Sequence, residues 1–132
     1  MLSPITERQF KRLFERYHDA NLESLPSGAG LVTLPNFELP SGWNTKTTDV
    51  RFLIPVGYPG PFPDCFWTSR GLRLANGQMP QNAQEEHQIP ETSHRLLWFS
   101  WHITDAAKNW NPSRDDLLTY AKIIAVRFEK LQ

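Results

Sequence analysis

The chain has 132 residues, of which 39% are hydrophobic and 21% charged, and this is the composition of a globular protein rather than a disordered or fibrous one. Fourteen Lys and Arg balance fourteen Asp and Glu, which argues against a general nucleic-acid binder and against attraction to an acidic membrane. No apolar run reaches the roughly 18 residues of a membrane span, and the N-terminus has no apolar signal core. We therefore expect one domain over residues 1–132, located in the cytoplasm.

The pattern of cysteine and histidine argues against a metal site. Cys65 is the only cysteine, so it cannot form an internal disulfide or a cysteine-based zinc site by itself. The spacing of His87, His94 and His102 fits no zinc motif. The sequence also has no glycine-rich loop of the kind that binds phosphates. We expect no metal and no cofactor.

The first predicted element is an N-terminal helix. Ser3 is typical of an N-cap, Pro4 of the first helical position, and Glu7 favours the dipole of the first turn. An apolar stripe at helical spacing follows, formed by Phe10, Leu13, Phe14 and Tyr17. The other face is mostly basic and contains Arg8, Lys11, Arg12 and Arg16. This basic face indicates either a docking site for an acidic partner or an ordinary solvated surface.

The middle of the chain predicts strands and a proline-rich turn. Residues 31–39 and 48–56 are rich in β-branched and aromatic side chains and predict two or three antiparallel strands. Residues 58–63, with three prolines, cannot be helical and predict a stiff, extended turn. A short buried strand, Cys65-Phe66-Trp67, is expected directly afterwards.

The remaining chain predicts a long irregular segment and a second helix. Residues 69–95 are polar and contain several Gly and Pro, so they indicate either a functional flap or a mobile loop. Ser113 is the expected N-cap of the second helix, with Asp115 and Asp116 in its first turn. The apolar stripe of this helix consists of Leu117, Tyr120, Ala121, Ile124 and Phe128.

This order of elements resembles the ubiquitin-conjugating E2 (UBC) fold, and two motifs carry the resemblance. The proline turn over residues 58–63, followed by Phe66-Trp67-Thr68, is similar to the Tyr-Pro-x-x-Pro-Pro segment of E2 enzymes and the strand after it. Trp110-Asn111-Pro112 is similar to the Trp-x-Pro that opens the helix after an E2 active site. The resemblance implies an α+β fold with an N-terminal helix, an antiparallel β-meander of about four strands, a long irregular active-site segment and a C-terminal helix.

Further motifs resemble one bacterial family, prokaryotic E2 family E. They are the turn over residues 57–60, the Phe66-Trp67 pair, Leu72-Arg73-Leu74 before Gly77, and Trp101-His102 before Trp110. The family implies a transferase role in bacterial ubiquitin-like protein conjugation and in antiviral defence. Its implied partners are a ubiquitin-like protein, an E1-like adenylating enzyme and often a JAB-type peptidase. In E2 enzymes the first helix generally meets the E1. Here the long segment around Leu72, Leu74 and Met79 to Ile89 could hold the extended tail of the modifier.

The resemblance places His102 where an E2 has its catalytic cysteine, eight residues before Trp110. A thiolate there would carry an acyl group, whereas an imidazole can act as a general base. His102 could therefore activate the hydroxyl of Ser100, Thr104 or the more distant Ser93, and Ser100 is favoured because it shares a face with His102 if the segment is extended. Asp105 could orient the imidazole or position an incoming amine. Alternatively, His102 could orient the modifier's tail, or it could be a structural residue that packs among tryptophans. Cys65 matches a core strand residue and not the nucleophile.

The sequence is compatible with three functions. The first is a conjugating factor that takes part in acyl transfer without a cysteine at the usual position. The second is a non-catalytic E2-like scaffold that binds a ubiquitin-like protein or the E1. The third is an unrelated α+β enzyme whose proline turn is similar to that of an E2 by coincidence.

Overall fold

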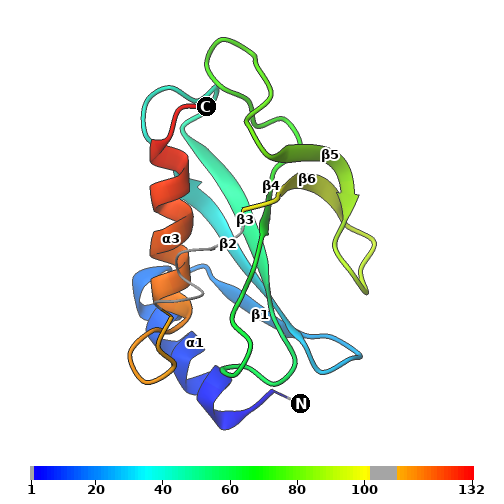
Figure 1. The fold of residues 1–132 in the computed structure, drawn as a ribbon, viewed down its shortest axis with the longest axis vertical. Coiled ribbons are helices and arrows are strands. Elements are labelled where there is room, and N and C mark those ends of the chain that lie inside the picture. Colours follow the sequence, from blue (N-terminus) through cyan, green and yellow to red (C-terminus); the bar gives the residue numbers. More distant parts are fainter. Residues whose placement is uncertain (1, 102–109) are drawn as a thin grey trace.

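The computed structural model of the protein describes residues 2–101 and 110–132. Within these ranges, two helices lie on one side of an antiparallel sheet with the strand order β1-β2-β3-β4-β6-β5 (Figure 1). The predicted α+β, UBC-like class is confirmed. The elements are α1 (Pro4–Arg16), β1 (Asn21–Ser24), β2 (Gly30–Glu38), β3 (Thr47–Ile54), β4 (Phe66–Thr68), β5 (Ala83–Gln88), β6 (Arg95–Phe99) and α3 (Leu117–Glu129).

The N-terminal helix begins as predicted, but its apolar stripe is narrower. Ser3 is the N-cap, its hydroxyl accepts a hydrogen bond from the N–H of Thr6, and a proline occupies the first turn. Leu13 is fully buried in the core, whereas Phe14 is 47% exposed. Tyr17 caps the C-terminus of the helix and stacks on Phe37 of β2 at a centroid distance of 5.6 Å.

The two strongest predicted strands form the centre of the sheet. They correspond to β2 and β3, which pair antiparallel from Gly30↔Ile54 to Glu38↔Thr47. The register shifts between Leu34 and Phe37, where Pro35 lies. A proline has no N–H for the ladder, so a bulge is the place where a strand tolerates it.

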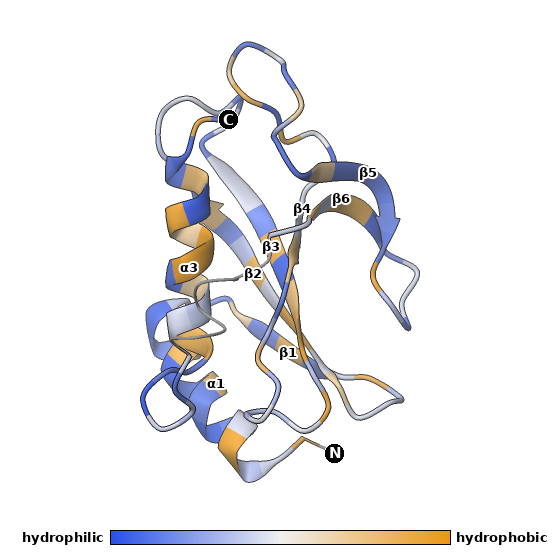
Figure 2. Cartoon of the chain, viewed as in Figure 1, coloured by the Kyte–Doolittle hydropathy of each residue, from blue (hydrophilic) through white to orange (hydrophobic). Residues whose placement is uncertain are grey.

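The sheet is larger than the meander of about four strands that the sequence predicts. Residues 69–95, expected to be irregular, contain β5 and lead into β6, and this hairpin extends the sheet beyond β4. β5 has the polar sequence Ala-Gln-Glu-Glu-His-Gln and is mostly exposed as an edge strand. Figure 2 shows it almost entirely hydrophilic. A polar edge strand lacks the apolar alternation that identifies a half-buried one.

The C-terminal helix starts later than predicted. Its N-cap is Asp116 and not Ser113; the Asp116 carboxylate accepts from the N–H of Thr119 at 3.0 Å, and the Thr119 hydroxyl accepts in return from the N–H of Asp116 at 3.1 Å. The preceding residues form a separate turn, in which the N–H of Asp115 donates to the carbonyl of Asn111. The predicted stripe is confirmed, since all five of its residues are fully buried: Leu117, Tyr120, Ala121, Ile124 and Phe128.

Two hydrophobic clusters lie on the two sides of the sheet. The larger cluster fills the space between the sheet and the helices. The smaller cluster lies on the other side and contains Trp67 with residues from two hairpin loops, 24–30 and 88–95. A side chain bridges the tips of these loops, because Ser27 donates through its N–H and its hydroxyl to the carboxylate of Glu91 at 2.7 and 2.6 Å. The loops of the two sheet ends are thereby joined.

Candidate active site

The described residues on either side of positions 102–109 define the candidate site. Ser100 directly follows β6, is half-buried, and its N–H donates to the carbonyl of Asn82 at 2.8 Å. Trp110 begins the turn that leads to α3. His102 and Asp105, the other predicted catalytic residues, lie outside the described residues, and their roles stay predictions.

The two sequence motifs behind the E2 resemblance meet in the structure. Phe62 of the proline turn stacks on Trp110, with ring centroids 5.6 Å apart and 25° between the planes. Tyr58, at the start of the turn, is buried and donates its hydroxyl to the side chain of Gln9 in α1. Burial, helped by the nearby carboxylates of Asp116 and Asp115, raises the pKa of Tyr58. The proline turn is therefore packed between α1 and the segment that precedes α3.

Cys65 is close to the same site but is poorly suited to act as a nucleophile. It lies just before β4, is 7% exposed, and its carbonyl accepts a hydrogen bond from the hydroxyl of Tyr120 at 2.8 Å. Burial and the neighbouring carboxylate of Asp64 raise the pKa of its thiol to about 11, although a backbone hydrogen bond with Trp101 opposes this shift. A thiol with this pKa is almost entirely protonated at neutral pH.

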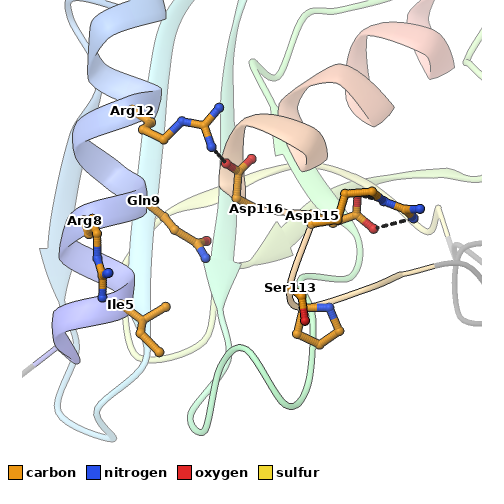
Figure 3. Close-up of a pocket in the computed structure, with 9 residues that line it drawn as sticks. Ile5, Arg8, Gln9, Arg12, Ser113, Asp115 and Asp116 are labelled. Carbon is orange, nitrogen blue, oxygen red and sulfur yellow. Dashed lines mark hydrogen bonds and ion pairs between the residues drawn. The ribbon is translucent and has the colours of Figure 1, made fainter.

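The predicted basic face of α1 is exposed and borders a cleft. Arg8 and Arg12 line this cleft of about 300 Å³ between α1 and the turn before α3 (Figure 3). Arg12 forms an ion pair with Asp116 at 2.6 Å, and Arg114 forms one with Asp115 at 3.2 Å. Arg8 has no ion-pair partner in the described part of the chain. Lys11 and Arg16 are also exposed.

Leu72 and Leu74 do not form a surface, contrary to the prediction that they hold a modifier's tail. They are 1% and 8% exposed and belong to the larger core cluster. Leu74 forms an isolated bridge with Trp43, which brings this segment against the loop between β2 and β3. Because the Leu-Arg-Leu pattern lies in a polar segment, the sequence suggests that its leucines are exposed. In the structure the segment packs onto the core, and the two leucines point inward.

The sequence prediction missed Arg127, which contacts the candidate site from α3. It is 1% exposed, and its guanidinium lies over the ring of Trp101 at 5.3 Å. Arg127 falls three and seven positions after Ile124 and Tyr120, on the buried stripe of its helix. A charged residue on an otherwise apolar stripe was the available signal.

The fold and the arrangement around positions 102–109 define an E2-like protein of the UBC type. The family model described as prokaryotic E2 family E matches residues 9–131, nearly the whole chain, so the chain belongs to this family. No curated protein and no solved structure matches it. In the described residues, no three His, Cys, Asp or Glu side chains gather as a metal site would require, and no helix is long and apolar enough to cross a membrane.

Proposed function

We propose that the protein is the E2-like component of a bacterial ubiquitin-like protein conjugation pathway and that it takes part in acyl transfer without a thioester of its own. The observation that carries this proposal is the burial and raised pKa of Cys65, the only cysteine of an E2-family chain. With a pKa of about 11, roughly one thiol in ten thousand is ionised at pH 7. A hydroxyl ester is an acyl link that such a chain can still form.

The proposed reaction uses Ser100 as acyl carrier, with His102 as general base and Asp105 as the residue that orients the imidazole. The Ser100 hydroxyl oxygen attacks the thioester carbonyl of the E1-bound modifier; a C–O bond forms, the C–S bond breaks, and His102 passes the serine proton to the departing thiolate. An amine then attacks the ester; a C–N bond forms, the C–O bond breaks, and the amine's proton returns to the serine oxygen. The position of Ser100 beside the family's active-site segment supports this assignment.

The proposed partners are a ubiquitin-like protein and an E1-like adenylating enzyme, with a JAB-type peptidase in the same cytoplasmic system, which we place in antiviral defence. We assign the E1 to the basic face of α1, formed by Arg8, Lys11, Arg12 and Arg16. The exposure of these four side chains and the unpaired state of Arg8 among the described residues support this assignment. An exposed cation without a partner can take up an acidic side chain without breaking an existing ion pair.

Reconstitution with the cognate E1, modifier and ATP tests the reaction. We expect a protein–modifier adduct that survives a thiol reductant but is cleaved by hydroxylamine or mild base. Ser100→Ala should abolish the adduct, His102→Ala should slow its formation by about 100-fold or more, and Cys65→Ser should leave it intact. An adduct that the reductant cleaves, or one that persists in Ser100→Ala, contradicts the assignment of Ser100.

A second candidate function is a non-catalytic scaffold, which Arg8 also favours, since it borders the cleft and has no ion-pair partner among residues 2–101 and 110–132. A scaffold would bind the E1 or modifier equally well after Ser100→Ala and His102→Ala, and it would form no adduct. Arg8→Glu should weaken binding in both cases, whereas Lys46→Glu, an exposed charge reversal on the loop between β2 and β3, serves as the matched control. Binding without any adduct would replace the catalytic proposal with this one.

A further inference from the structure

A buried cation that pairs with no Asp or Glu side chain of the described residues lies next to the candidate site. Arg127 of α3 is among the largest fully buried side chains, and no Asp or Glu side chain of the described residues pairs with it. Its guanidinium donates instead to three main-chain oxygens, those of Gln81, Lys130 and the last residue of the sequence, Gln132, at 2.9–3.1 Å. Its Nε has no hydrogen-bond partner there. Burying a charge in this way is costly, and an apolar side chain would fill the space without that cost.

The aromatic contacts of Arg127 give the charge a role. Its guanidinium lies over the ring of Phe99 at 5.2 Å and over the ring of Trp101 at 5.3 Å. The ammonium of Lys130 lies over the same Trp101 ring at 4.9 Å. The Trp101 ring is therefore contacted by two cations, and cations at these distances are attracted to the negative face of an indole.

The two rings that Arg127 contacts belong to the residues on either side of Ser100. Side chains alternate along an extended chain, so Phe99 and Trp101 face α3 while Ser100 faces the other way. Phe99 is further fixed by stacking on Phe66 at 4.8 Å. The N–H of Ser100 is held by the carbonyl of Asn82. The backbone of Ser100 is thus fixed from both neighbours and from the β5 side.

We propose that Arg127 and Lys130 are positioning residues for the acyl carrier: by holding Phe99 and Trp101, they fix the direction in which the Ser100 hydroxyl points. This inference rests on the proposed function. It accounts for a buried charge that the packing of the core does not need. A misplacement of the nucleophile by about 1 Å can cost a reaction about 100-fold, so a fixed backbone at this point has kinetic value.

The test compares four variants in the reconstituted reaction. Arg127→Met keeps the size of the side chain and removes the charge, and because it strands no buried Asp or Glu side chain of the described residues we expect it to fold. It should lower the rate of adduct formation by about tenfold or more, Lys130→Gln by about threefold, and Arg127→Lys should restore part of the loss. Lys122→Gln, an exposed charge removal on the same helix, is the control and should have no effect.

A spectroscopic readout separates positioning from a loss of fold. In protein labelled with 5-fluorotryptophan, the ¹⁹F resonance of Trp101, assigned with Trp101→Phe, should shift in Arg127→Met and Lys130→Gln but not in Lys122→Gln. Normal adduct rates in both Arg127→Met and Lys130→Gln, or an unmoved resonance, would overturn the positioning role while the proposed function stands. No adduct with the unmodified protein would overturn both.

Discussion

Replacing Asp116 with alanine tests the arrangement at the start of α3, where the structure and the sequence prediction differ. Asp116 has two roles, since its carboxylate caps the helix through Thr119 and pairs with Arg12 of α1. Ser113, the cap expected from the sequence, makes no cap contact and lies in the turn before the helix. We therefore expect alanine substitutions at Asp116 and Ser113 to lower the free energy of unfolding by very different amounts.

The expected cost of Asp116→Ala is the sum of two contributions. Loss of the N-cap costs about 1 kcal/mol, at most about 2. The ion pair adds only about 0.5 kcal/mol, because the Arg12 side chain is 62% exposed and solvent weakens the attraction. We expect the free energy of unfolding to fall by about 1.5 kcal/mol, which lowers Tm by roughly 6 °C for a chain of this length.

Three related variants separate these contributions in urea unfolding followed by circular dichroism. Asp116→Asn keeps a good cap and removes the charge, so it should lose only about 0.5 kcal/mol, and less in high salt. Arg12→Ala should cost the same small amount. Ser113→Ala should change the free energy of unfolding by less than about 0.5 kcal/mol. An equal loss in Ser113→Ala and Asp116→Ala would refute the observed helix start.

Three further outcomes are expected. Cys65 should react with a disulfide reagent far more slowly than free cysteine at pH 8. Because its folded pKa of about 11 exceeds the ordinary value of 9.0, the stability that the protonated thiol contributes is complete below pH 9 and is lost between pH 9 and about 11. A free energy of unfolding that stays constant over that range, in comparison with Cys65→Ser, would contradict the burial of the thiol. Tyr120→Phe leaves the carbonyl of Cys65 without its buried donor and should lower the free energy of unfolding by about 1–3 kcal/mol, measured by urea unfolding. Gly42→Ala should cost about 1 kcal/mol or more in thermal unfolding, because Gly42 has a φ of +110° and an added Cβ would come within 2.5 Å of Leu131.

The sequence predicts best where local chemistry and burial agree. The N-cap at Ser3 and the apolar stripe of α3 are two such features, and the structure confirms each of them. Phe14 fits the helical spacing but remains exposed. The spacing shows which side of a helix is apolar, but it does not show how much of that side the rest of the protein covers. β5 has no apolar pattern, and only its pairing with β6 makes it a strand.

The candidate site was less predictable, for a physical reason. The motifs around the proline turn and Trp110 indicate the family, and their contact through Phe62 agrees with that resemblance. Leu72 lies in a polar segment whose sequence suggests exposure, and Arg127 is a charged residue on an apolar helix stripe, yet both are buried. Burial of this kind depends on long-range packing, which a single sequence does not display.

The contact between Ser27 and Glu91 has a consequence for how the molecule opens. It links the loop after β1 to the loop after β5, and these strands are the two ends of the sheet order. An edge strand that is joined only to its neighbour can detach alone, but here neither end can detach without breaking the link or carrying the other end with it. We expect amide hydrogen exchange in β1 and β5 to report one shared opening event, and Glu91→Gln to separate it into two.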